Sequence, residues 1–145
     1  MGFFSKIKKQ TAPREKCRSF VTFKCGGQSY GLPLELLCEI TAKPLFSKLP
    51  VSEPAFAGVM DNKGEACMVY DLSITLLGTP SRPGAKNCVL ILSLNGVKRG
   101  CLVEEPGEIV TIPESAIDSA VTEGFRLARY SGSRLLLPER ELYFP

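Results

Sequence analysis

Two strand-like runs joined by Asn95-Gly96 constrain the fold of this chain more than any other feature. Residues 88–94 (CVLILSL) and 97–103 (VKRGCLV) are both rich in aliphatic side chains. An Asn-Gly pair between two such runs favours a type I′ turn, because both residues tolerate the positive φ angles that this turn requires. The twist of that turn suits antiparallel strands. The sequence therefore predicts a β-hairpin over residues 88–103.

A second hairpin is predicted over residues 58–72, whose sequence is GVMDNKGEACMVYDL. Asp61, Asn62, Lys63 and Gly64 form a polar interruption between two apolar arms. Asp and Asn tolerate left-handed backbone, and Gly adopts it without a steric penalty. We therefore expect these four residues to carry the turn.

The rest of the chain contains further short strands separated by turn residues. We expect strands at residues 19–25, 28–32, 108–112 and 135–137, a helical turn at 34–40 that passes into strand near Ile40, a helical turn at 72–77 that is stopped by Gly78, and a terminal turn or helix at 139–144. Pro44, Pro50 and Pro54 predict an irregular segment, and no single state is predicted for residues 113–133. Many short antiparallel segments without a long amphipathic helix or a βαβ rhythm indicate an all-β domain.

Positive charge is concentrated at the N-terminus. Residues 1–18 hold six basic residues against Glu15 alone, a net charge of +5, and the remainder holds 12 basic and 14 acidic residues, a net charge of −2. We expect residues 1–17 to form a flexible basic tail and residues 18–145 to form the folded domain, with a Pro- and Gly-rich linker near 78–87. A nucleic-acid-binding domain would also carry positive charge on its folded face, so no nucleic acid is expected as a partner.

The residue types of common catalytic and metal sites are sparse. The chain has no histidine, and none of its six cysteines forms a Cys-x-x-Cys pair, so zinc-ligand spacing and Ser–His or Cys–His pairs are absent. The acidic cluster Glu104-Glu105-x-x-Glu108 fits acid–base work or a metal, but acid-rich loops are commoner than catalytic pairs. We expect no catalytic residue, no metal and no cofactor.

The cysteines and the hydropathy pattern bear on the compartment. Cys25, Cys67, Cys88 and Cys101 lie in or beside apolar strand-like runs, where reduced cysteine behaves as a small hydrophobe. These positions favour structural thiols in a reducing cytoplasm, although the spacing also allows a disulfide framework. No apolar run approaches the ~20 residues that a membrane-spanning helix needs, so no membrane insertion is expected.

The segment at residues 58–72 resembles the signature of CheW-like coupling proteins, which runs roughly Gly-Val-Ile-Asn-Leu-Arg-Gly-Glu-Val-Val-Pro-Val-Ile-Asp-Leu. The matching positions are Gly58, Val59, Gly64, Glu65, Val69, Asp71 and Leu72. The similarity covers about residues 19–112, and includes Leu37-Cys38-Glu39-Ile40, which looks like the family's Val-x-Glu-Ile. Lys63 stands where the family usually has Arg, and Met68 stands where Pro is common.

The resemblance implies a fold and a function. The fold would be two small five-stranded SH3-like β-barrels with short helical turns, packed around a common hydrophobic core. The function would be that of a non-catalytic adaptor coupling chemoreceptors to a CheA-type histidine kinase, in an array for swimming or for twitching or gliding motility. One barrel would bind the kinase regulatory domain, and the groove between the barrels would take the tip of a methyl-accepting chemoreceptor. The protein would be cytoplasmic, in receptor arrays at the inner membrane.

Five residues match places where the family makes or supports partner contacts: Leu37, Glu39, Gly58, Val59 and Lys63. Glu39 and Lys63 could pair across the surface, or could be two solvated turn residues. Leu37 and Val59 fit a hydrophobic core equally well, and Gly58 suits the backbone whichever function is right. The alternative function is a small β-barrel that binds nucleic acid or another protein outside chemotaxis, for which Phe23-Lys24 and Lys98-Arg99 are the hints.

Overall fold

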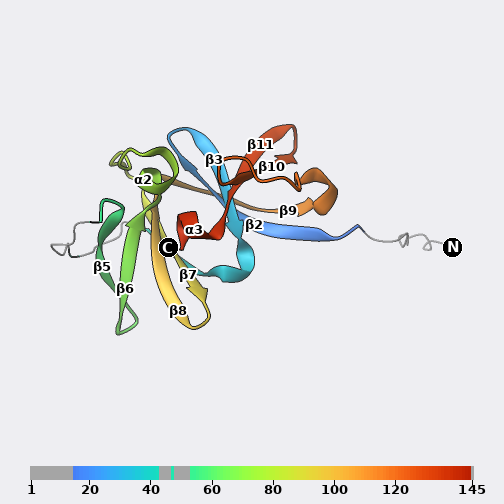
Figure 1. Ribbon diagram of the computed structural model, residues 1–145. Helices are drawn as coiled ribbons and strands as arrows, with labels where there is room; N and C mark the ends of the chain where they lie inside the picture. Colours follow the sequence, from blue (N-terminus) through green and yellow to red (C-terminus); the bar gives the residue numbers. More distant parts are fainter. Residues whose placement is uncertain (1–14, 43–46, 48–52, 145) are drawn as a thin grey trace.

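The computed structural model describes residues 15–42, 47 and 53–144, and most of these residues lie in short β-strands (Figure 1). The first sheet contains β2 (Cys17–Cys25), β3 (Gln28–Pro33), β9 (Glu105–Pro113), β10 (Phe125–Tyr130) and β11 (Ser133–Pro138), in the order β10-β11-β3-β2-β9. The second sheet contains β4 (Leu37–Ala42), β5 (Phe56–Asn62), β6 (Glu65–Asp71), β7 (Cys88–Leu94) and β8 (Val97–Val103), in the order β4-β7-β8-β6-β5. These two five-stranded sheets confirm the predicted all-β class.

The helical elements are short, as expected. They are the 3-10 turns η1 (Leu34–Leu36) and η2 (Glu114–Ala116) and the helices α2 (Leu72–Leu77) and α3 (Arg140–Tyr143). The N-terminus of α2 is capped by Asp71, and its C-terminus is closed by Gly78, whose φ of 80° lies in the left-handed region. In the described part of the chain, no helix is long and apolar enough to cross a membrane.

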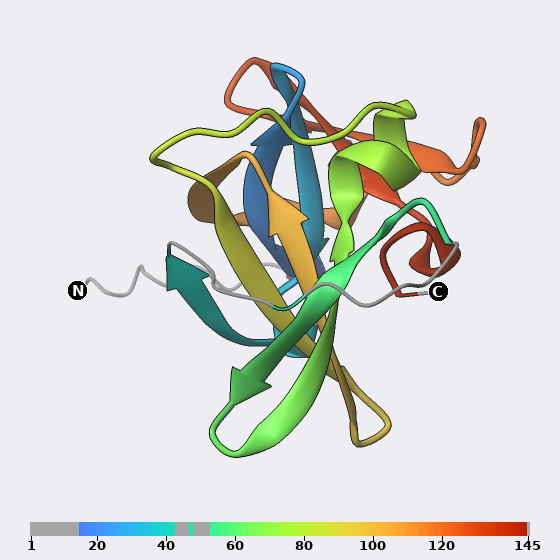
Figure 2. The same ribbon diagram turned by 90° about the vertical axis from the view of Figure 1, so that its left-hand side faces the viewer.

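The first sheet combines the N-terminal strands β2 and β3 with the C-terminal strands β9, β10 and β11. The chain passes to the second sheet through η1 and returns at Glu104, between β8 and β9. In the first sheet, the last strand of the chain, β11, pairs in parallel with β3. In the second sheet, β6 pairs in parallel with β8. Figures 1 and 2 show the two sheets side by side, with the β5–β6 and β7–β8 hairpins extending from the second sheet.

A hydrophobic layer shared by both sheets holds them together. It consists of Val21, Phe23, Cys25, Tyr30 and Leu32 from the first sheet, and of Leu72, Cys88, Leu90, Leu92, Cys101, Val103 and Tyr143 from the rest of the chain. Fully burying one such large side chain contributes roughly 1.5–3 kcal/mol. The common core implied by the resemblance is therefore confirmed.

Each sheet also has a core of its own. Phe20, Val110, Ile112, Ala128, Leu135 and Leu137 form that of the first sheet, and Met60, Cys67, Val69, Val89 and Ile91 form that of the second. Successive side chains of a strand point to opposite sides of its sheet. In β7, Leu90 therefore faces the shared layer, whereas Val89 and Ile91 face the separate core of the second sheet. This alternation explains why β7 is apolar along most of its length.

The two predicted hairpins are present, and one turn needs correction. Asn95 and Gly96 have φ angles of 52° and 80°, as a type I′ turn requires. In the other hairpin, Asp61 and Asn62 belong to β5, and the turn consists of Lys63 and Gly64, with φ angles of 53° and 86°. The reason is the register: Asn62 pairs with Glu65, which leaves two residues for the turn.

Other boundaries also differ from expectation. The strand predicted to begin near Ile40 already begins at Leu37, because β4 pairs with β7 from Leu37 onward. Part of the region without a prediction forms β10, which pairs with β11. The segment 78–87 joins α2 to β7, so it connects two strands of the second sheet. Pro44 and Pro50 and most of the predicted basic tail lie outside the described residues, and Pro54 lies in a turn.

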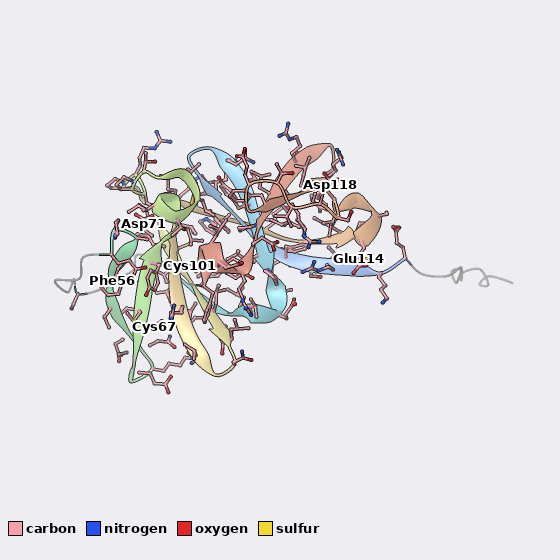
Figure 3. The ribbon with its side chains drawn as sticks, viewed as in Figure 1. Phe56, Cys67, Asp71, Cys101, Glu114 and Asp118 are labelled. Carbon is pink, nitrogen blue, oxygen red and sulfur yellow. The ribbon has the colours of Figure 1, made fainter. Side chains whose placement is uncertain are left out.

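All six cysteines are free thiols. Cys25, Cys67, Cys88 and Cys101 are buried, as expected from their apolar surroundings, and two of them are labelled among the strands of the second sheet in Figure 3. Burial raises the pKa of Cys88 to about 11. These thiols are therefore protonated at neutral pH and pack as small apolar groups.

Candidate functional site

The two edge strands of the second sheet meet through their side chains. The Oε1 atom of Glu39 in β4 lies 3.7 Å from Nζ of Lys63. Lys63 stands in the turn at the tip of the β5–β6 hairpin. The same oxygen accepts a hydrogen bond of 3.2 Å from Nδ2 of Asn62. Since β4 and β5 stand at opposite ends of the strand order, these contacts show that the sheet curls until its edges approach. The expected pairing of Glu39 with Lys63 is confirmed.

The contacts continue across the sheet to β8. Nζ of Lys98 lies 3.4 Å from Oδ1 of Asn62 and 3.8 Å from Oε1 of Glu65. Asn62 is only 4% exposed, so its amide needs partners on both sides, and it has Glu39 on one side and Lys98 on the other. We call Glu39, Asn62, Lys63, Glu65 and Lys98 the edge cluster.

The edge cluster presents fixed charges to solvent. The hydrogen bond from Asn62 is the largest cause that lowers the pKa of Glu39, and Lys63 and Thr41 add to it. Glu39 is therefore ionised at neutral pH. The side chain of Lys63 is 79% exposed, and an exposed ion pair of this kind stabilises a fold little. Its charge is instead available to a partner.

The other three predicted site residues have structural roles. Leu37 is half-buried and packs against the shared layer. Gly58 is buried at a β-bulge, where the pairing of β5 with β6 shifts register. Val59 is half-buried, and its backbone N–H and C=O groups each form a hydrogen bond of 2.8 Å with Ser47. Of the five residues, the structure brings only Glu39 and Lys63 into direct contact through charged groups.

A partly exposed apolar face lies on the other side of the second sheet from the edge cluster. Val59 pairs with Met68, which pairs in turn with Arg99, so their side chains lie on one side of the sheet. Val97 lies on the same side two residues before Arg99. Met68 is 40% exposed and Val97 is 48% exposed. We call Val59, Met68 and Val97 the apolar face.

Aromatic side chains continue the apolar face toward the shared layer. The guanidinium carbon of Arg99 lies 5.5 Å from the ring centre of Tyr70 and 5.1 Å from that of Phe144. Tyr70 also makes an edge-on contact with Phe56, at 5.7 Å between ring centres. Met, Tyr and Arg are enriched in protein interfaces. Sequence reasoning did not find Met68 or Val97 as candidates, although the alternation in β8 would place Val97 on the side of Cys101 and Val103.

Two carboxylates of the acidic cluster bind neighbouring parts of the chain. Each oxygen of the Glu104 carboxylate accepts a backbone hydrogen bond, from Gly26 at 2.9 Å and from Arg82 at 2.7 Å. Glu105 lies 3.7 Å from Lys86. Among the residues that the structure describes, no three His, Cys, Asp or Glu side chains are grouped to hold a metal ion.

The hints of nucleic-acid binding are not supported by the geometry. Phe23 is 1% exposed and stacks on Tyr30 inside the shared layer, so its ring cannot receive a base. Lys98 and Arg99 point to opposite sides of β8, toward the edge cluster and toward Tyr70 respectively. A nucleic-acid groove would need aromatic rings interleaved with positive charges on one face.

Comparison with known proteins identifies relatives of this chain. The family model of the CheW-like domain matches residues 19–140. The chain is 24% identical over 110 residues to the chemotaxis protein CheW of Bacillus subtilis (strain 168). The aligned region covers 76% of this chain and 70% of that protein. The chain is also similar to the crystal structure of the scaffolding protein TtCheW from Thermoanaerobacter tengcongensis, with a TM-score of 0.77 and 21% identity over 86% of this chain and 90% of that one. The structural likeness confirms the predicted fold.

Proposed function

Since this chain belongs to the CheW-like domain family, we propose that it is a non-catalytic adaptor that couples chemoreceptors to a CheA-type histidine kinase. Its place would be the cytoplasm, in receptor arrays at the inner membrane. The proposal rests on one observation above the others: the second sheet of this family fold carries a partly exposed apolar face on one side and a cluster of fixed charges on the other. A scaffold needs such a surface for binding, and it needs no reactive group.

The apolar face suits a helical partner such as the tip of a methyl-accepting chemoreceptor. An amphipathic helix would gain affinity by burying side chains spaced i, i+3 and i+4 against Val59, Met68 and Val97. Arg99 sits between this face and two aromatic rings, where a planar guanidinium adds stacking and hydrogen-bond donors.

The edge cluster suits recognition of the kinase regulatory domain. Lys63 and Glu39 would orient that partner and would disfavour others by like-charge repulsion. Leu37 and Gly58 would act indirectly, since they shape β4 and β5 beneath the contact. Val59 would contribute both to the apolar face and to the backbone of β5.

The test is a pull-down from a lysate of the host cell with the full chain as bait, identified by mass spectrometry. We expect a multidomain histidine kinase and long coiled-coil receptors, whose identities would also name the motility pathway. Recovery of nucleic acid or of a metabolic enzyme, with neither of these, would refute the adaptor proposal and support the alternative binding module.

A second test compares two single variants in which a lysine is replaced by glutamate. Lys63→Glu should weaken kinase or receptor recovery about tenfold while the thermal transition stays nearly unchanged, because Lys63 is exposed and its ion pair contributes little to stability. Lys86→Glu is the matched control, since Lys86 is 73% exposed and also lies 3.7 Å from a glutamate. Equal recovery with both variants would show that Lys63 is not an interface residue.

A further inference from the structure

A pocket of about 210 Å³ opens at one end of the first sheet, beside α3. Arg18 near the start of β2 and Arg126 near the start of β10 line it, and Arg140 and Tyr143 of α3 complete its wall. Phe20 and Leu137 contribute apolar side chains to the lining. Residues of four strands (β2, β3, β10 and β11) and of the helix α3 thus line one small cavity. It lies away from the edge cluster and the apolar face, which belong to the second sheet.

The charges of this pocket are unbalanced. Glu139 is the one carboxylate in its lining, and its Oε2 atom lies 3.7 Å from Nε of Arg126. Arg18 is held by its contact with Phe20, at 5.1 Å from the ring centre. Within the described chain, neither Arg18 nor Arg140 forms an ion pair with a carboxylate. Two guanidinium groups therefore face the cavity or its rim without a counter-charge from the lining.

Tyr143 gives independent evidence of a missing acceptor. It is only 5% exposed, and among the described residues its hydroxyl group has no hydrogen-bond partner, although its carbonyl accepts one from Cys101. A phenol that lines a pocket and has no acceptor in the described chain can donate a hydrogen bond to a bound ligand. Burial is the largest cause that raises the pKa of Tyr143, with smaller effects from Arg140, Arg18 and Glu35. The phenol is therefore a neutral donor at physiological pH.

We propose that this pocket binds an oxyanion, a carboxylate or a phosphate group, held by Arg18, Arg140 and the Tyr143 hydroxyl. A guanidinium group matches the two oxygens of such an anion in a bidentate fork. The Tyr143 phenol donates a third hydrogen bond from the wall formed by α3. Glu139 keeps Arg126 paired, so the anion is recognised by the two arginines that the chain leaves without a carboxylate.

The experiment follows the arginine Nε–Hε signals of the full ¹⁵N-labelled chain by NMR. Inorganic phosphate is titrated in one series and malonate in another, with chloride replaced to hold the ionic strength constant. We expect saturable shifts of the Arg18 and Arg140 signals. Tyr143→Phe, which keeps the ring in the shared layer, should weaken binding about tenfold. Saturation by phosphate alone would assign the site to phosphate groups, and saturation by both probes would assign it to oxyanions that include carboxylates.

Arg134→Gln is the matched control for Arg140→Gln. Arg134 is an exposed arginine at the opposite end of β11, outside this pocket. We expect Arg140→Gln to remove saturable binding and Arg134→Gln to leave it intact. The proposal would be overturned by shifts that do not saturate with either probe, by equal weakening in both variants, or by a Tyr143→Phe variant that binds as tightly as the wild type.

Discussion

Lys63 shows how a single residue of the candidate site is placed at some cost to stability. A non-glycine residue in the left-handed region loses roughly 1–2 kcal/mol relative to its preferred backbone, and Lys63 has a φ of 53°. Nothing in the turn requires lysine, because glycine would adopt this conformation more readily. The side chain is nevertheless held beside Glu39 and directed to solvent.

Lys63→Gly should therefore separate stability from binding. We expect the free energy of unfolding to rise by up to about 1 kcal/mol, since glycine removes the left-handed penalty and loses part of that gain to unfolded-chain entropy. Recovery of the kinase or receptor should fall. Chemical denaturation and the pull-down measure the two effects.

Glu123→Gly provides the comparison, because Glu123 has a φ of 54° and also precedes a glycine. It should stabilise the chain to a similar extent without affecting partner recovery. A Lys63→Gly variant that is less stable than the wild type, or that recovers partners normally, would contradict the account of Lys63.

At the scale of elements, Asp71 joins a strand, a helix and a loop. Asp71, which is labelled in Figure 3, ends β6 and caps α2. Its Oδ1 atom accepts a hydrogen bond of 3.0 Å from the Ser73 N–H group. Its carboxylate also accepts hydrogen bonds from the Ser81 hydroxyl at 2.6 Å and the Ser81 N–H group at 3.0 Å. The segment 78–87 is thereby fastened to the second sheet although it contains no regular structure.

Asp71→Ala should lower the free energy of unfolding by about 2–4 kcal/mol, because it removes a helix cap and leaves buried donors unsatisfied. Hydrogen exchange should show the loss of protection concentrated at α2 and Ser81. Asp118→Ala is a suitable control, since Asp118 is half-exposed and pairs only with Arg129 at 3.5 Å. That variant should lose less than about 1 kcal/mol. A comparable loss in both would mean that Asp71 does not act as a junction.

At the scale of the whole molecule, Glu104 connects the two sheets. It stands where the chain leaves the second sheet, and its carboxylate binds the Gly26 N–H group between β2 and β3 and the Arg82 N–H group in segment 78–87. The hydrogen bond from Arg82 is the largest cause that lowers the pKa of Glu104, followed by that from Gly26. One ionised side chain thus links three distant parts of the chain.

This connection predicts an acid-dependent stability. A carboxyl group whose pKa is lower in the folded state contributes its full stabilisation above the ordinary value of 4.5, and this contribution is lost as the pH falls below it. The denaturant concentration at the unfolding midpoint of the wild type should therefore decrease as the pH is lowered below about 4.5. Glu104→Gln should be less stable at neutral pH and should show a smaller acid-dependent loss. Glu39, whose pKa is also lowered, accounts for part of the dependence that remains.

Glu105→Gln tests whether the effect belongs to Glu104. Glu105 is its neighbour and pairs with Lys86 on the surface, so its variant should keep the acid dependence of the wild type. If Glu104→Gln and the wild type lose stability in parallel as the pH falls, Glu104 does not connect the sheets in the way described here.

The sequence by itself determined what depends on neighbouring residues. The Asn95-Gly96 turn, the alternation of β7 and β8, the short helix stopped by Gly78 and the buried cysteines all follow from local backbone preferences and a two-residue period. The family resemblance added the two-sheet plan with its shared core and the pairing of Glu39 with Lys63. The turn at Lys63 was assigned two residues too broadly, because its limits depend on the pairing register and not on residue type.

Only the tertiary structure decided which distant parts meet. Asn62 reads as a turn residue in the sequence, and it becomes the buried link between Glu39 and Lys98 because the second sheet curls until β4 approaches β5. Arg18 and Arg140 stand at opposite ends of the chain, and they share a pocket because the first sheet is built from both chain ends. Such contacts arise from packing the shared hydrophobic layer, which is a property of all strands together and leaves no mark in any short stretch of sequence.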